Sequence, residues 1–461
     1  MRSRARAISG LVTLGLALAL PRSAAADTEE GFYYSDDAAL VAGAVTAWTR
    51  DAGAVWYNPA GLATTGRTQL TLNGTIYALK IRRVPDALRT TFPGVGQRSV
   101  DIESSDIMSA PHATAFVKPL SDTFAVAIGI YITQRDVRTS ANTLEVAGAA
   151  TAEFPIDAQF RQHLDTALEL TKYQLGPAFG WQIAPNVRIG ASVFMTYTKT
   201  SGLAVFEVDG TATAGDPRQT AFISSTQHAT VSELGLVSMV GVQWDPAPDW
   251  HLGATIRTPE LRFSASGEGS QIDATANTVA GGTGASLSFQ KLTDAGGGGL
   301  TVPPRLVVGV SHEASRRVIV SVEGDVLPGV EDVSTDTSTR TVVNGRAGVR
   351  VGLTDTLFMG LGVFSDRDRQ VLGPSLTEER IDRYGVTAGL QLLTPFTLHS
   401  DAGPKENGLV LGTTLALRYA AGLGQVRALD VDPASDLDSI TRIVDVTFHE
   451  FTPYIGTAVT F

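Results

Sequence analysis

The feature that most constrains this chain is a two-residue alternation of apolar and polar side chains, which recurs along most of its length. The clearest copy places five apolar side chains on one face: Phe124, Val126, Ile128, Ile130 and Ile132. Successive side chains of a β-strand point to opposite faces, so each such segment has one apolar face. Charged residues such as Arg188 and Arg350 fall on the other face. The pattern predicts an all-β fold.

The strands of a soluble β-sandwich alternate in the same way, so the lengths of the connections must distinguish a sandwich from a membrane barrel. Long and short links take turns along the chain, as in outer-membrane barrels. We therefore predict a 14-stranded antiparallel transmembrane β-barrel, apolar outside and polar inside. Its strands are expected near residues 68–80, 110–119, 123–135, 172–184, 187–200, 230–244, 250–263, 303–313, 317–327, 343–353, 357–365, 382–393, 408–420 and 442–461. The intervening long segments are predicted to be loops, with a short amphipathic helix over residues 157–172.

Other routes through a membrane are excluded by composition. The chain has no cysteine, so it has neither disulfides nor cysteine metal sites. After residue 26 no run reaches the roughly 18 apolar residues that a membrane-spanning helix needs. A chain that crosses a membrane without such helices does so as a closed barrel, because only closure pairs every backbone polar group.

Residues 1–26 predict a secretory signal peptide. Three arginines precede the apolar run of residues 8–20, and small residues up to Ala26 suit cleavage before Asp27. Removing these residues takes Lys+Arg from 36 to 32 against 47 Asp+Glu, so the mature net charge is −15. Such a charge argues against nucleic acid as a partner.

Residues 27–67 precede the barrel, residues 68–461, and do not alternate. Asn58 before Pro59 forces the chain out of the helical region, and Ala60 and Gly61 let it turn again without bulk. A barrel of fourteen strands is wider than the eight-stranded kind that side chains fill, so something must occlude its lumen. We predict that this compact segment is a hatch that plugs the lumen.

The end of the chain carries a second signal. Gly456, then Val459, then the terminal aromatic Phe461 look like the C-terminal assembly signal of outer-membrane barrels. This signal implies the outer-membrane barrel assembly machinery as a partner. A chain that ends in phenylalanine by chance is the alternative.

Together these features resemble the FadL/TodX family of outer-membrane transporters for hydrophobic compounds. The family's hatch carries Asp-Ala-Gly followed shortly by Asn-Pro-Ala, and the matching residues here are Asp51, Ala52 and Gly53, then Asn58, Pro59 and Ala60. The layout matches over nearly the whole chain. No loop residue aligns, so the ligand-binding residues stay unknown.

The resemblance implies passive diffusion of long-chain fatty acids or hydrocarbons across the outer membrane of a Gram-negative bacterium. Membrane lipid and lipopolysaccharide then surround the barrel. In this family the ligand leaves sideways through the wall near a kinked third strand, which corresponds to residues 124–134. Gly129 and Gln134 are the positions where such an opening is expected. Gly129 also fits a plain small residue on the lumen face.

Two other functions remain open on the sequence. A general diffusion porin for hydrophilic solutes would share the fold without the hatch. A barrel-embedded lipid hydrolase would need a catalytic set, yet neither Gly-x-Ser-x-Gly nor His-Glu-x-x-His occurs. We predict no enzyme activity, cofactor or metal site. The acidic residues Glu29, Glu30, Asp36 and Asp37 are interpreted as a solvated tail.

Overall fold

The structure is a computed structural model. It describes residues 31–92, 96–149, 158–212, 220–279, 282–294, 299–332, 337–372, 379–396, 399–400, 403–404, 408–431 and 441–461. The predicted signal peptide and its cleavage site at Ala26 lie outside the described residues, as do Glu29 and Glu30.

Within the described residues three short helices precede the sheet: α2 (Asp36–Leu40), α3 (Ala54–Tyr57) and the 3-10 helix η1 (Pro59–Thr64). The strands are β1 (Gln69–Phe92), β2 (Gly96–Ser121), β3 (Phe124–Ala149), β4 (Ala158–Ala184), β5 (Val187–Ala212), β6 (Thr220–Ala247), β7 (Trp250–Arg257), β8 (Glu260–Val279), β9 (Gly282–Asp294), β10 (Gly299–Val302), β11 (Arg305–Ser315), β12 (Val318–Leu327), β13 (Glu331–Asp332), β14 (Thr337–Ser338), β15 (Val342–Gly352), β16 (Leu357–Asp366), β17 (Glu379–Phe396), β18 (His399–Ser400), β19 (Gly403–Pro404), β20 (Leu409–Val431) and β21 (Thr441–Thr460). The pairs β13–β14 and β18–β19 form separate two-stranded sheets.

The main sheet closes into a barrel, because β1 pairs antiparallel both with β2 and with the last strand, β21. Among the described residues this sheet has 17 strands, so the predicted count of fourteen is wrong. One predicted strand is divided into β7 and β8 at Thr258 and Pro259, because proline has no N–H to donate to a central ladder. β9 and β10 form in a segment that was predicted to be loop.

The predicted orientation of the wall is confirmed. Ile128 and Ile130 are half-exposed on the outside, whereas Ala127 between them is buried on the lumen side. Other strands repeat the outward apolar row with Leu70, Val240, Leu361 and Leu415. An apolar outer face around a closed sheet suits a bilayer. No helix in the described ranges is long and apolar enough to cross one.

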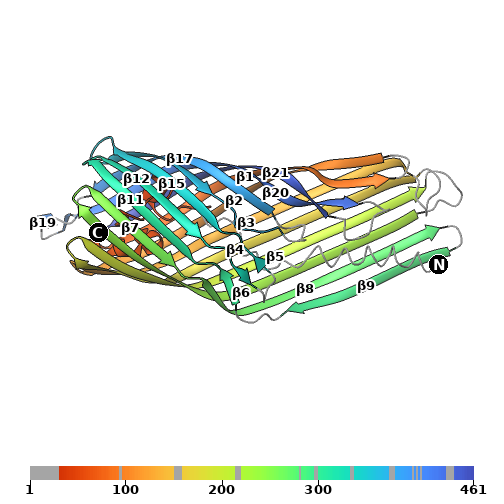
Figure 1. Cartoon of the computed structure of the whole chain (residues 1–461), viewed down its shortest axis with the longest axis horizontal. Helices are drawn as coiled ribbons and strands as arrows, with labels where there is room; N and C mark the ends of the chain where they lie inside the picture. Colours follow the sequence, from red (N-terminus) through yellow and green to blue (C-terminus); the bar gives the residue numbers. More distant parts are fainter. Residues whose placement is uncertain are drawn as a thin grey trace.

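The wall is much taller on one side than on the other. β1 to β6 have 24 to 28 residues, whereas β11, β12, β15 and β16 have 10 or 11. In Figure 1 the long strands continue to the right, past the ends of the short ones. A bilayer needs only about ten residues per strand, so the long strands extend far beyond it.

These extensions correct several predicted loops. Residues 81–109, 136–171 and 201–229 continue the strands wherever they are described, and the predicted amphipathic helix over 157–172 belongs to β4 from Ala158 on. Outside a bilayer a paired strand needs no apolar outer face. The alternation therefore fades there although the ladder continues.

Candidate functional site

Residues 31–66, the N-terminal segment, fold compactly against the inner wall. Ser35 caps α2 by accepting a hydrogen bond from the Ala38 amide (3.1 Å), and Asp51 accepts one from the amide of Gly53 (3.0 Å). Asn58 is extended and caps η1, while Pro59 takes the first position of that helix. The predicted tight bend at Asn58 and Pro59 is present because both residues favour this turn.

Asn58 also fixes the segment to the wall. Its amide nitrogen donates to the carbonyl oxygens of Thr46 (2.8 Å) and Val242 on β6 (3.0 Å). Further wall side chains bond the segment from other directions, among them Asn73, Ser192, Gln243 and Glu323. Contacts from β1, β5, β6 and β12 mean that strands surround the segment.

A belt of wall glycines makes room for this packing. A Cβ atom on Gly190 would lie 2.3 Å from the carbonyl carbon of Pro59, and one on Gly241 would lie 2.1 Å from the Asn58 Oδ1. Atoms do not approach so closely, so any side chain there would displace the segment. The glycine belt comprises residues of eight strands: Gly180, Gly190, Gly241, Gly253, Gly348, Gly360, Gly362, Gly389 and Gly456.

The acidic residues of the segment are not a solvated tail, and that interpretation is wrong for Asp36. Asp36 is 4% exposed and accepts a hydrogen bond from the Tyr454 hydroxyl (3.0 Å). Burial raises the pKa of Asp36 to about 6. Burial, with the negative charges of Asp37 and Asp36, raises the pKa of Asp51 to about 7. The N-terminal segment therefore contains carboxyl groups that titrate near neutral pH.

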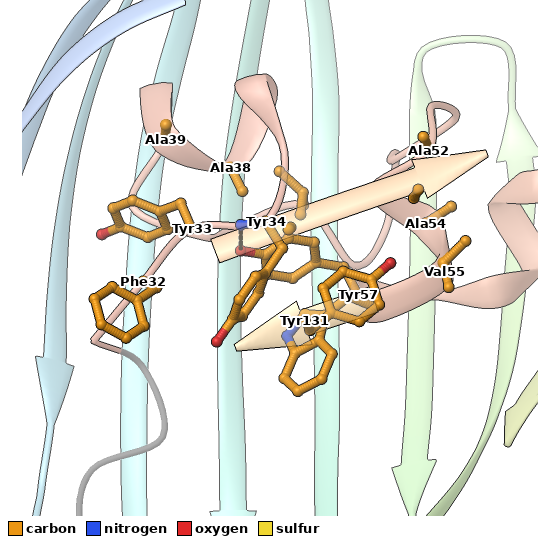
Figure 2. Close-up of a cluster of buried hydrophobic side chains, with 14 of the residues drawn as sticks. Phe32, Tyr33, Tyr34, Ala38, Ala39, Ala52, Ala54, Val55, Tyr57 and Tyr131 are labelled. Carbon is orange, nitrogen blue, oxygen red and sulfur yellow. Dashed lines mark hydrogen bonds between the residues drawn. The ribbon is translucent and has the colours of Figure 1, made fainter. Parts of the chain in front are cut away.

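Aromatic rings join the segment to the wall. Tyr34 and Trp56 of the segment pack on Tyr131 of β3, with ring centres 5.4 and 5.2 Å away, and Tyr131 packs on Phe194 of β5 at 5.7 Å. Figure 2 shows Tyr34, Tyr57 and Tyr131 side by side in this aromatic cluster, defined as Tyr34, Trp56, Tyr57, Tyr131 and Phe194. Offset and edge-to-face contacts of this kind stabilise a packed core.

A cavity adjoins the aromatic cluster. It contains about 480 Å³ of space between atoms, a figure that includes open solvent at its mouth. Its lining includes the apolar side chains of Trp56, Phe194 and Met239 and the charged side chains of Arg257 and Arg305. Arg305 is paired with Asp325 and the Arg257 guanidinium lies 5.2 Å from the centre of the Trp56 ring. The cavity therefore offers apolar contact beside charges that already have partners.

Farther along the long strands, buried ion pairs cross the lumen. Arg82 of β1 contacts Asp106 of β2 (3.4 Å) and Glu379 of β17 (3.3 Å), and Arg138 of β3 contacts Glu379 at 3.0 Å. Asp136 of β3 joins Lys80 at 3.0 Å and Arg82 at 3.4 Å. Four strands separate β3 from β17 in the sheet, so these contacts join strands that are not neighbours in the wall.

The predicted lateral-opening residues lie beside an irregularity in β3. Gly129 faces the lumen, where a Cβ atom would lie 2.5 Å from the Tyr131 ring, so its small size makes room for that side chain. Thr133 is an extra residue between Ile132 and Gln134 in the pairing with β4, which is a β-bulge. Among the described residues, the ladder between β2 and β3 runs from Ser121 and Phe124 to Ala113 and Tyr131 and no further.

The predicted assembly-signal residues lie at the closure of the barrel. Gly456 pairs with Asn73 and belongs to the glycine belt, and Val459 pairs with Leu70. Phe461 is half-exposed, and its amide donates to the Thr68 carbonyl (3.0 Å).

Sequence reasoning missed the glycine belt and the buried ion pairs. Glycines that recur on the polar face of successive strands, such as Gly190 and Gly241, are the signal that could have revealed the belt. The ion pairs lie on strand extensions without alternation, so the sequence offered no comparable signal for them. Within the described residues, no group of three or more His, Cys, Asp or Glu side chains is arranged to hold a metal ion.

Comparisons with known proteins agree with this barrel geometry. Residues 23–322 match the family described as "Outer membrane protein transport protein (OMPP1/FadL/TodX)". The fold is similar to that of a Pseudomonas aeruginosa FadL homologue, at 13% identity, TM-score 0.54, and 92% and 98% coverage of this chain and that chain. It is also similar to the P. putida toluene transporter TodX, at 13% identity, TM-score 0.60, and 94% and 99% coverage. Among curated proteins none matches the sequence significantly.

Proposed function

The chain belongs to the FadL/TodX family of outer-membrane transporters for hydrophobic compounds, and from this premise we propose that it carries small hydrophobic molecules by passive diffusion. The observation that carries the proposal is the cavity beside the aromatic cluster, between the N-terminal segment and the wall. Such a site binds apolar molecules by contact and by exclusion of water. The related structures include a toluene transporter. Aromatic hydrocarbons are therefore candidate ligands of this chain, as are long-chain fatty acids.

We propose that the N-terminal segment is the hatch of this transporter. The glycine belt supports this role, because it lets the segment's backbone lie directly on the wall and leaves little room for water between them. A segment held in this way would block water and ions while a ligand passes beside it.

We further propose that the ligand leaves sideways between β2 and β3. The ladder between these strands ends at Ala113 and Tyr131, and the bulge at Thr133 redirects β3 at the same level. The aromatic cluster contains Tyr131, so an apolar ligand could pass from the cluster to the seam without entering water. Gln134, at the far side of the bulge, lies at the edge of this route.

Deleting residues 31–62 tests the hatch. We expect the variant to form an ion-conducting pore in planar bilayers while the full chain conducts little, because the lumen loses its filling. Equal conductance of the two proteins would contradict the plug. Passage of sugars through the full chain, without uptake of a labelled fatty acid or of toluene, would instead favour a porin.

Deleting Thr133 alone tests the lateral route. Without the extra residue β3 regains regular pairing, and we expect uptake of a hydrophobic probe to fall while its binding to purified protein persists. Unchanged uptake would contradict exit beside β3.

A further inference from the structure

A buried glutamine on the lumen face has no hydrogen-bond partner in the described part of the chain. Gln174 of β4 is fully buried, and both its amide oxygen and its amide nitrogen are unpartnered there. It lies directly opposite Tyr131 on β3 and Thr196 on β5. Directly paired residues share a face of the sheet, so all three side chains point into the lumen.

Two hydroxyl groups of β3 are also unpartnered among the described residues. The Tyr131 hydroxyl is fully buried and lies over Gly129, whereas the Thr133 hydroxyl is on a residue 6% exposed, on the other side of Tyr131 along the strand. Most buried polar side chains are hydrogen-bonded, because a buried group without a partner loses its hydrogen bonds to water and gains none in the protein. The Gln174 amide and the Tyr131 hydroxyl, on directly paired residues of neighbouring strands, therefore form an unpartnered patch, a place where a ligand can supply the missing hydrogen bonds.

Charges beside the patch are already balanced. Lys172 is paired with Glu260, and Thr196 donates to the other oxygen of the same carboxylate (2.7 Å). A carboxylate ligand would meet the negative charge of Glu260 beside a cation that is already paired. It also has no proton to donate to the amide oxygen of Gln174. The patch is thus unsuited to an anion.

The remaining side of the patch is apolar. The Tyr131 ring lies 5.7 Å from Phe194 and 5.2 Å from Trp56, so the polar groups sit at the edge of the aromatic cluster. A ligand in this position has its body on aromatic rings and one end at the amide.

We propose that Gln174 and Tyr131 form a subsite for the uncharged hydroxyl group of an otherwise apolar ligand, an alcohol or a phenol. A hydroxyl both donates and accepts, so it can donate to the Gln174 Oε1 and accept from the Gln174 Nε2 or the Tyr131 hydroxyl. A pure hydrocarbon leaves these groups unpaired. This inference rests on the proposed function, because it assigns polarity to the ligand of that transporter. The subsite lies beside the cavity, which shares Trp56 and Phe194 with the aromatic cluster.

The test compares two probes of similar shape, cyclohexylmethanol and methylcyclohexane, neither of which absorbs near 280 nm. Binding to the full-length protein in detergent is followed by tryptophan fluorescence, because Trp56 belongs to the aromatic cluster. Gln174→Leu should change the ratio of the two affinities by about tenfold in favour of the hydrocarbon. Tyr131→Phe, which removes a single oxygen atom, should change it in the same direction by about threefold.

Gln227→Leu is the matched control. Gln227 is also buried, with neither amide atom partnered, but it lies opposite Ala204, eight residues beyond Thr196 along β5. The control should leave the affinity ratio unchanged.

An unchanged ratio in both Gln174→Leu and Tyr131→Phe, with both probes bound, overturns the subsite alone. If neither probe binds the unmodified protein, the proposed function itself fails. Should Gln174→Leu not assemble, Tyr131→Phe decides.

Discussion

Two levels of the lumen differ in the kind of contact that they contain. At the level of the N-terminal segment, here called the segment zone, backbone lies on glycines and aromatic rings pack together. Farther along the long strands, in the ion-pair zone of Lys80, Arg82, Asp106, Asp136, Arg138 and Glu379, the wall contacts itself through buried charges.

The difference teaches which level can open. Close packing loses contacts at once when it moves, whereas ion pairs can be exchanged for water at a smaller net cost, since desolvation already offsets much of their attraction. We therefore infer that the segment zone stays closed and that the ion-pair zone admits the ligand. Four predictions examine this contrast.

The largest effect is expected in the ion-pair zone. Asp136→Asn removes the shared partner of Lys80, Arg82 and Arg138, and leaves cations buried. Breaking a buried pair in this way costs about 3–5 kcal/mol, which folding titrations in lipid vesicles would measure. Asp101→Asn is the control, because its partner Arg83 is 60% exposed, and it should have no measurable effect. Equal effects of the two variants would show that the buried ion pairs contribute no more to the free energy of unfolding than the exposed pair does.

The second prediction concerns pH in the segment zone. The pKa of Asp36 is raised from 3.8 to about 6, so the folded state holds the proton more tightly than the unfolded state. The contribution of Asp36 to the packing of the segment should therefore weaken as pH rises from about 4 to about 6, by at most about 3 kcal/mol, and Asp51, whose pKa is raised to about 7, extends the weakening to about pH 7. More frequent openings in bilayer recordings at pH 8 than at pH 5 would support this. Asp36→Asn should reduce that dependence and leave the part that Asp51 contributes, and openings that keep the same pH profile would contradict it.

The third prediction concerns the glycine belt. Gly190→Val inserts a side chain where Pro59 already lies, and overpacking of this kind costs about 1–3 kcal/mol. We expect added conductance, because the segment must shift. Gly345→Val is the control, since the nearest atom to its Cβ position is 4.0 Å away. If both variants conducted alike, the close approach at Gly190 would be without consequence.

The smallest effect concerns one hydrogen bond in the segment zone. The Ser192 hydroxyl donates to the Val55 carbonyl (2.8 Å), and Ser192→Ala should lower the free energy of unfolding by about 1 kcal/mol. Ser321 is equally buried, and its hydroxyl has no partner in the described part of the chain. Ser321→Ala should therefore lower the free energy of unfolding by less than Ser192→Ala does. A larger loss from Ser321→Ala would contradict the stabilising role of the Ser192 hydrogen bond.

Much of the wall was predictable because its physics is local. Ile128 and Ala127 could be assigned to opposite faces because a strand alternates with a fixed period of two. The bend at Asn58 and Pro59 was predictable for the same reason, since both residues restrict their own backbone. The predicted number of strands was wrong where Pro259 divides a strand. The predicted lengths of β1 to β6 were wrong where the strands extend beyond the bilayer, because no bilayer imposes a pattern there.

By itself the sequence determined the closed all-β wall, its apolar outside and the bend of the leading segment, because each depends on neighbours along the chain. Only the tertiary structure decided that Gly190 lies under Pro59, that Arg138 meets Glu379 across the lumen and that Gln174 ends beside Tyr131. Those contacts join residues tens to hundreds of positions apart. Their geometry follows from the register of paired strands and the curvature of the closed sheet, which no short stretch of sequence specifies.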